Sequence, residues 1–231
     1  IGNMVQANAV AQAAHNSYGV STIIAGLLLA FICGLVIIGG VKRIGRIAEI
    51  VVPFMTVLYF AGAVVVLIVN RERFFDAFGL IFRYTFSFSS VGGGISGYVI
   101  LLAMRYALSR GVFSNEAGLG SAPIAHACAD CRSGVEQGFW SVFEVFLDTI
   151  LMCTITALVI LTSDCWCGGL TGTELTSAAF GEVLGSWGSG FITLAVILFG
   201  FCSIIGWCCY GEKCVEYLSK KRRSVKLYRI V

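Results

Sequence analysis

An apolar run over residues 78–110 is about long enough to cross a bilayer. Gly92, Gly93 and Gly94 interrupt this run near its middle. Adjacent glycines supply no side-chain packing and raise the entropic cost of a helix, so we expect the helix to break there. In hydrocarbon an unwound backbone is tolerated only inside protein or beside a wet cavity, because unpaired amide groups are costly. The three glycines therefore predict a binding site.

Hydroxyl groups precede the triple glycine, at Ser87, Ser89 and Ser90. Hydroxyl oxygens and freed backbone carbonyls are the hard oxygen ligands that a small cation prefers, and they also bind polar solutes. Ser89 and Ser90 are therefore candidate sodium ligands, and the glycines are candidate substrate contacts. A simpler interpretation is that small residues allow two helices to cross closely, which requires no ligand.

The composition excludes a soluble globule. Of 231 residues, 58% are hydrophobic and 13% are charged, which leaves too little polar surface to cover a soluble domain. We therefore expect a single all-helical membrane domain over residues 1–231. Its expected spans are 21–41, 50–69, 78–110, 138–162 and 188–210. A sixth span, 1–14, starts without an initiator Met or a signal sequence, as expected of a fragment of a longer polypeptide.

Basic residues alternate between the connections of these spans. One set of connections holds Lys42, Arg43, Arg46, Arg105, Arg110, Arg132, Lys213, Lys220, Lys221, Arg222 and Arg223. The connections between them are poorer in basic residues, with Arg71 and Arg73 as the main exception. By the positive-inside rule the first set is cytoplasmic, so span 1–14 runs outward and span 188–210 runs inward.

The spacing of the cysteines favours neither zinc binding nor redox function. Cys128 and Cys131 form a lone C-x-x-C, without the second pair of ligands that a zinc site requires. Cys165 and Cys167 lie on the expected outer side, where a C-x-C disulfide would be strained. The other cysteines in the apolar spans are more simply small hydrophobic residues.

Carboxamides are concentrated in the first segment, at Asn3, Gln6, Asn8 and Gln12. Such groups cost free energy at membrane depth unless they are paired, so we expect them to face other helices or a solute. Asn8 and Gln12 share one helical face, whereas Gln6 lies nearer the face of Asn3. Asn3 and Gln6 are candidate substrate contacts, and hydrogen bonds between helices are an equally consistent interpretation.

Acidic residues lie inside span 138–162. Asp148 and Thr149 are placed well within its apolar stretch, where an ionisable residue indicates function, and both are candidate sodium ligands. Glu144 lies one turn before Asp148 on the same face, so the two carboxylates could bind a cation or a proton. The alternative is that one or both form ion pairs with Arg83 or Arg105.

Five stretches carry a family resemblance: GNMVQAN (2–8), KRIGRIAEIVVPFMTVLY (42–59), RGVFSNEAGLGSAPIAHA (110–127), FLDTILMCTITALVIL (146–161) and SIIGWCCYGEKC (203–214). The third, in an expected inner loop over 111–136, is the most distinctive, and its residues suit capping and turns rather than catalysis. Together the stretches resemble the alanine or glycine:cation symporter family, which comprises sodium-coupled transporters of small neutral amino acids.

The resemblance implies a LeuT-like inverted-repeat transporter bundle, of which this chain would supply roughly core helices 3 to 8. Span 78–110 would be the discontinuous sixth core helix. Gln6 matches a polar position in the third helix, and Trp207 matches an aromatic wall that would limit the solute to the size of alanine or glycine. Ser203 matches a hydroxyl ligand for sodium in the eighth core helix. An ordinary core or interfacial aromatic is the alternative for Trp207.

These observations predict sodium-coupled symport of small neutral amino acids across the cell membrane. Sodium is the expected coupling ion, and no other cofactor is expected. The expected partners are the amino acid substrate, the lipid bilayer and the missing transporter helices, but no nucleic acid. The alternative is a non-transporting membrane remnant or structural protein without a complete site. A channel and an intramembrane enzyme are disfavoured, because the sequence shows no filter, charge ring, nucleophile–base pair or metal constellation.

Overall fold

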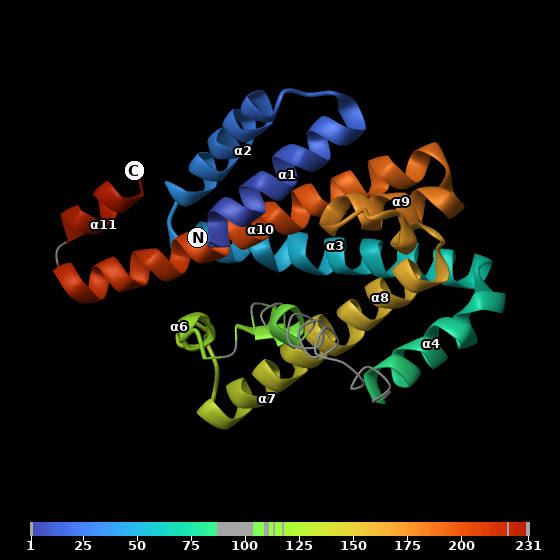
Figure 1. Cartoon of the computed structure of the whole chain (residues 1–231). Helices are drawn as coiled ribbons and strands as arrows, with labels where there is room; N and C mark the ends of the chain where they lie inside the picture. The colour runs from blue at the N-terminus through green and yellow to red at the C-terminus, as the bar shows by residue number, and fades with distance from the viewer. Residues whose placement is uncertain are drawn as a thin grey trace. The chain divides into compact units, whose positions relative to one another are not determined.

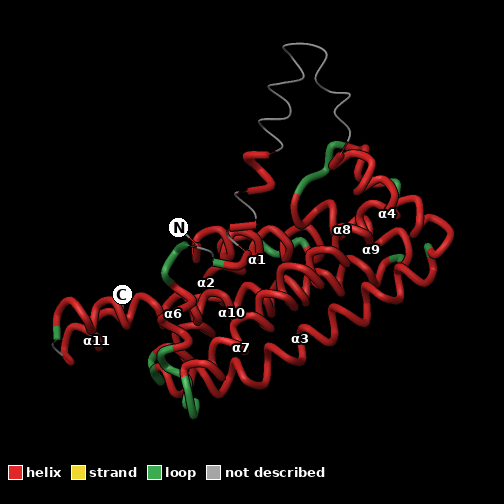
Figure 2. The backbone as a smooth tube through the Cα atoms, turned by 90° about the horizontal axis from the view of Figure 1, so that it is seen from below, coloured by secondary structure: helices red, strands yellow, loops and turns green. Residues whose placement is uncertain are grey.

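The structure is a computed structural model that describes residues 2–86, 104–108, 111–112, 114–116, 118–220 and 222–229 (Figure 1). Every regular element in these ranges is a helix, which confirms the expected all-helical class (Figure 2). The chain divides into two compact units, residues 1–69 with 163–231 and residues 70–162. Each unit is described by itself below.

Both units are built from helices of very different lengths. The first contains α1 (Gly2–Tyr18), α2 (Thr22–Ile37), α3 (Val41–Val69), the 3₁₀-helix η3 (Cys165–Gly168), α9 (Gly172–Leu184), α10 (Ser186–Ser219) and α11 (Arg222–Tyr228). The second contains α4 (Arg71–Phe86), α6 (Ser121–His126), α7 (Gly134–Val145), the π-helix η2 (Phe146–Met152) and α8 (Cys153–Thr162). α7, η2 and α8 follow one another without a break and form one helix over Gly134–Thr162, of 29 residues.

Three of the described helices are long and apolar enough to cross a membrane: α3, the combined helix Gly134–Thr162, and α10. They contain the expected spans 50–69, 138–162 and 188–210, and α2 is a shorter apolar helix of 16 residues. α3 begins at Val41, earlier than expected, because the charged residues before Ile50 are compatible with a helix. Gly40, with φ 75°, provides the boundary between α2 and α3.

In the first unit α1 lies antiparallel to α10 (Figure 1). Close to the start of α1, a Cβ atom on Gly2 would lie 3.1 Å from Cε2 of Trp207. Close to its end, the Ser17 hydroxyl lies 2.5 Å from that of Thr193. Between these points Gly200 leaves room for the side chain of Val10. The two helices therefore approach closely along most of α1, as small residues permit in a membrane.

α9 was not expected from the sequence, which indicated only a connection between the spans 138–162 and 188–210. It forms a tight hairpin with α10 through Gly185, whose φ of 59° is unfavourable for other residues. Its Phe180 is fully buried, with its ring centroid 5.8 Å from that of Tyr59 and 5.6 Å from that of Phe191. The burial of this aromatic side chain explains why a comparatively polar segment folds against the long helices.

α11 turns back against the end of α10 in the first unit (Figure 1). Glu212 of α10 is buried, and both of its carboxylate oxygens accept hydrogen bonds from Arg229, at 2.8 Å from Nε and 2.6 Å from Nη2. These hydrogen bonds raise the pKa of the Arg229 guanidinium above its usual value. The ion pair therefore fixes the end of the described chain to a membrane-spanning helix.

We predict that Gly188→Ala destabilises the first unit. A Cβ atom there would lie 2.6 Å from the carbonyl oxygen of Phe180 and 2.7 Å from Cα of Gly181, and backbone atoms cannot rotate away. The expected loss in free energy of unfolding is about 1–3 kcal/mol. Thermal unfolding in detergent micelles measures it, with Gly206→Ala of the same helix as the control, because a Cβ there meets no atom within 4 Å. Equal melting temperatures for the two variants would contradict the packing.

We also predict that Arg229→Met costs about 3–5 kcal/mol of stability, because it leaves the Glu212 carboxylate buried without its partner. The double variant with Glu212→Leu should recover most of the loss, since it removes the uncompensated charge. Lys213→Met is the control: Lys213 pairs with Glu216 at 3.0 Å on a more exposed surface, where a pair contributes about 1 kcal/mol or less. Urea or thermal unfolding of the four proteins tests the prediction, which fails if the double variant is no more stable than Arg229→Met.

Candidate functional site

The structure brings four of the predicted site residues to one interface in the first unit. Asn3 and Gln6 lie on α1, and Ser203 and Trp207 lie on the stretch of α10 that faces the start of α1. All four are half-buried. On each helix the spacing of three or four residues places the pair on one face. The interface is therefore the candidate functional site of this unit.

The side-chain amide of Asn3 is only partly satisfied at this interface. Its Nδ2 donates a weak hydrogen bond to Cys208 Sγ over 3.7 Å. Its Oδ1 is buried and has no hydrogen-bond partner in the described part of the chain. A buried acceptor without a partner costs about 1–3 kcal/mol, so it requires an explanation. A ligand that donates a hydrogen bond, or a cation, would supply one.

Trp207 forms the apolar side of the same site. Its indole covers Gly2, whose missing side chain allows the close contact, and it packs edge-to-face on Tyr210 with ring centroids 5.8 Å apart. An amide oxygen and an indole that lie on neighbouring helices provide polar and apolar contacts together. This combination is typical of sites that bind small amphipathic molecules.

A cluster of hydroxyl groups lies at the opposite end of the α1–α10 interface, and the sequence did not reveal it. Thr193 is buried and contacts Ser17, and its hydroxyl also reaches the carbonyl oxygen of Ala13 at 3.4 Å. Ser189 donates to the Ser17 hydroxyl over 3.2 Å. Hydroxyl pairs of this kind hold membrane helices together. A single sequence shows such residues only as small and polar, without indicating which ones meet.

In the second unit, Asp148 and Thr149 lie in the π-helical turn η2. Such turns are rare and occur frequently at functional sites. The Ser114 hydroxyl donates to Asp148 Oδ2 over 2.9 Å. Thr149 Oγ1 is buried and, among the residues that the structure describes, has no hydrogen-bond partner. A carboxylate and an unpaired hydroxyl on consecutive residues provide the oxygen ligands that suit a hard cation.

Glu144 has a different partner from those considered from the sequence. Its Oε2 lies 3.7 Å from Nε2 of His126, and Nδ1 of the same imidazole lies 2.7 Å from Nε2 of Gln137. Ser121 Oγ donates to Glu116 Oε2 over 2.5 Å within the preceding loop. These contacts replace the ion pairs considered with Arg83 or Arg105. The two His126 contacts connect the distinctive loop to α7.

Some predicted residues are outside the part of the chain that the structure describes. Gly92, Gly93 and Gly94, with Ser87, Ser89 and Ser90, fall in this category, so the broken helix over 78–110 and its ligands stay predictions. Within the described ranges, no group of three or more His, Cys, Asp or Glu side chains is arranged to hold a metal ion.

Cys165 and Cys167 are free thiols in the structure. Burial raises the pKa of the Cys165 thiol, and the nearby Glu182 carboxylate, which accepts from it over 3.7 Å, raises it further. A raised pKa lowers the thiolate fraction at neutral pH and therefore the reactivity of Cys165.

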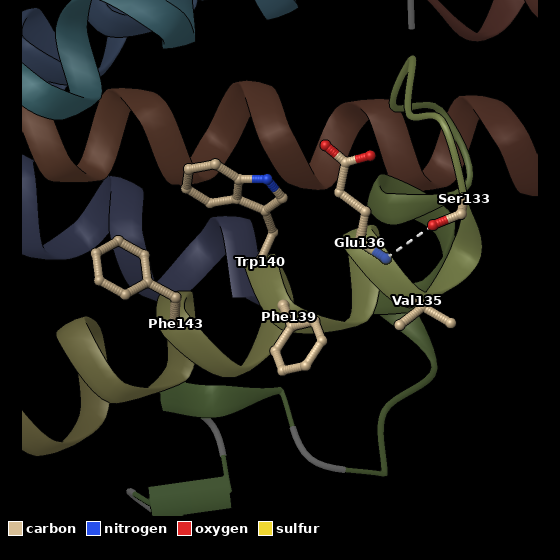
Figure 3. Close-up of a pocket in the computed structure, with 6 residues that line it drawn as sticks. All are labelled: Ser133, Val135, Glu136, Phe139, Trp140 and Phe143. Atoms are coloured by element: carbon tan, nitrogen blue, oxygen red, sulfur yellow. Dashed lines mark hydrogen bonds between the residues drawn. The ribbon is translucent and has the colours of Figure 1, made fainter.

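An apolar hollow of about 580 Å³ lies on α7 (Figure 3). It is lined by Ser133, Val135, Glu136, Phe139, Trp140 and Phe143. The Ser133 side chain already caps the helix, because it accepts from the Glu136 backbone amide over 3.2 Å. The aromatic side chains are exposed, which is typical of a lipid boundary, and too few polar groups converge there to bind an amino acid.

Comparison with known proteins decides the family. The profile of the sodium:alanine symporter family matches residues 1–231. The chain belongs to the sodium:alanine symporter family. It is therefore a member of a transporter family rather than an enzyme, and its long apolar helices are those of a multi-pass membrane protein. The resemblance seen in the sequence is confirmed.

Similar curated proteins include amino acid carriers of different stated substrates. The sodium/alanine symporter AgcS of Methanococcus maripaludis is 43% identical over all of this chain and 50% of its own length. The probable sodium/glutamine symporter GlnT of Bacillus subtilis is 41% identical over 99% of this chain and 47% of its own length. A sodium/proton-dependent alanine carrier of Bacillus sp. PS3 is 33% identical over 95% of this chain and 52% of its own length. The chain thus spans about half the length of these relatives.

We predict that Asn3→Leu raises the stability of the substrate-free protein by about 1 kcal/mol, because it removes a buried acceptor that lacks a partner while keeping a similar volume. Asn8→Leu is the matched control, since Asn8 is exposed on the same helix and should change stability little. Thermal unfolding in detergent without amino acid measures both. A marked loss of stability in Asn3→Leu would show that Oδ1 makes an essential structural hydrogen bond.

Proposed function

We propose that this protein takes part in sodium-coupled symport of small neutral amino acids across the cell membrane. The family supports cation-coupled amino acid transport as the class of activity. The observation that carries the proposal is the buried, unpartnered Oδ1 of Asn3 on the interface that also holds Gln6 and Trp207.

This interface suits the chemistry of an amino acid. The ammonium group has only donors, so the Asn3 and Gln6 amide oxygens are suitable partners for it. The indole of Trp207 is a suitable wall for a short apolar side chain. A large aromatic at this position limits the available volume, which favours alanine or glycine. Because a relative named for glutamine is about as similar as one named for alanine, side-chain size is the property to test.

Sodium is the proposed coupling ion. Its proposed hydroxyl ligands are Ser203 on α10 and, next to the triple glycine in the sequence, Ser89 and Ser90. Asp148 and Thr149 are a further proposed set, supported by the unpartnered Thr149 hydroxyl and the π-helical turn. Sodium would couple to transport by binding one conformation of the protein more tightly than another.

The LeuT-like arrangement is also part of this proposal. Inverted repeats place corresponding helices of the two repeats in opposite directions across the membrane. α1 would be the third helix of the first repeat and α10 the third helix of the second. Their antiparallel packing in the first unit supports this assignment.

We predict that uptake of radiolabelled alanine into proteoliposomes falls about tenfold or more when external sodium is replaced by choline at constant pH, because substrate affinity is coupled to the ion. Asn3→Leu should raise the KM for alanine strongly, whereas the control Asn8→Leu should not. The assay uses the full-length protein and compares alanine, glycine and glutamine. Sodium-independent uptake would contradict the coupling, and absence of both uptake and binding would favour the non-transporting alternative.

A further inference from the structure

A second hollow, of about 600 Å³, lies in the first unit where the start of α3 meets the end of α10. It is lined by Gly39, Gly40, Val41, Lys42, Glu212, Lys213, Glu216, Lys220, Val225 and Arg229. Four of these residues are basic and two are acidic. The hollow is thus positively charged, and the positive-inside pattern places it at the inner membrane surface.

Both carboxylates of the hollow already have basic partners. Glu212 binds Arg229 through two hydrogen bonds, and Glu216 binds Lys213 at 3.0 Å. Lys42 and Lys220 have no carboxylate within ion-pair distance among the described residues. Lys42 lies in the first turn of α3 and Lys220 directly follows the end of α10, so two residues far apart in the sequence line one hollow. Two ammonium groups without carboxylate partners indicate a site for an anion rather than a structural ion pair.

The backbone adds to the positive character of this site. α3 begins at Val41, and the first backbone N–H groups of a helix have no acceptor within the helix. Val41 and Lys42, the first residues of α3, line the hollow. The positive end of the α3 dipole therefore lies at the hollow and adds to the charge of Lys42.

The surroundings of the hollow are those of a headgroup region. Tyr217 and Leu218, next to the hollow on α10, are each 80% exposed, and Leu227 of α11 is 63% exposed. Besides Leu227, α11 carries the exposed basic side chains of Arg223 and Lys226. A short basic helix with exposed apolar residues, at the end of a membrane span, suits the boundary between lipid headgroups and acyl chains.

We propose that this hollow binds the phosphate group of an anionic phospholipid of the inner leaflet, through Lys42 and Lys220. Anionic headgroups are the phosphate source that is present at this depth, and basic hollows between membrane helices on the inner side bind them. Arg229 shapes the wall of the hollow while it is held by Glu212. Free inorganic phosphate shares the chemistry, and the test separates the two sources. The proposal does not depend on which amino acid is transported.

The experiment measures the lipid retained by the purified full-length protein after reconstitution in nanodiscs of phosphatidylcholine with phosphatidylglycerol. Native mass spectrometry counts the bound lipids of each class. Lys42→Gln/Lys220→Gln removes the two positive charges of the hollow that have no carboxylate partner, and Arg223→Gln/Lys226→Gln removes the same number of charges from α11 outside it. Lys42→Arg/Lys220→Arg retains the charge. Circular dichroism and thermal unfolding identify variants that fail to fold, in which case the two single Gln variants replace the double one.

We expect the retained phosphatidylglycerol to fall at least about fivefold in the hollow variant, with unchanged phosphatidylcholine. In the α11 variant and the Arg variant, the retained phosphatidylglycerol should stay within about twofold of that in the original protein. Equal losses in the hollow and α11 variants would overturn the proposal, because they indicate diffuse attraction to an anionic surface. Unchanged retention in the hollow variant would also overturn it. So would displacement of the lipid by millimolar inorganic phosphate, which would assign the hollow to a free anion.

Discussion

The close approach of α1 and α10 is the interaction on which the first unit depends. In a bilayer, helices gain little from hiding apolar side chains from one another, because lipid is equally apolar. Association then relies on tight packing and on hydrogen bonds between helices. Gly200 accommodates Val10, and the hydroxyls of Ser17 and Thr193 meet at one end. The same approach brings Asn3 alongside Cys208 at the other end, so the geometry of the candidate site is a consequence of helix packing.

Apolar length and charge predicted the membrane class and most of the long helices, because a bilayer imposes a minimum length on any apolar span. Boundaries were less accurate. Residues 42–49 carry charges that end an apolar run without ending a helix, so α3 extends back to Val41. α9 was missed because its stability comes from the burial of Phe180 against Tyr59, a contact distant in sequence. Hydropathy reports the surroundings of a segment and does not reveal such a partner.

In the candidate site, too, the sequence predicted some features correctly and missed others. The spacing of Asn3 and Gln6, and the family motif around Trp207, indicated residues that the structure does gather on one interface. The sequence did not indicate that Glu212 is buried with Arg229 as its partner, because that pairing requires α11 to turn back on α10. A charged residue close to the end of a span is interpreted as solvent-exposed when the position of its partner is not known. Pairing in space, rather than residue type, is what a single sequence lacks.

In the described part of the chain, the buried side-chain polar atoms without a hydrogen-bond partner belong to Asn3, Asn70 and Thr149. Each carries a cost that replacement by an apolar residue would remove. Asn70 is the single residue between the end of α3 and the start of α4. Thr149 is different, because it lies in a π-helical turn within a long apolar helix, next to a carboxylate that Ser114 holds. A helix that tolerates both an irregular turn and an unpaired hydroxyl at one point is less stable there than a regular apolar one. Binding of a cation that prefers oxygen ligands would offset that loss of stability. This is the physical reason to associate η2 with cation binding.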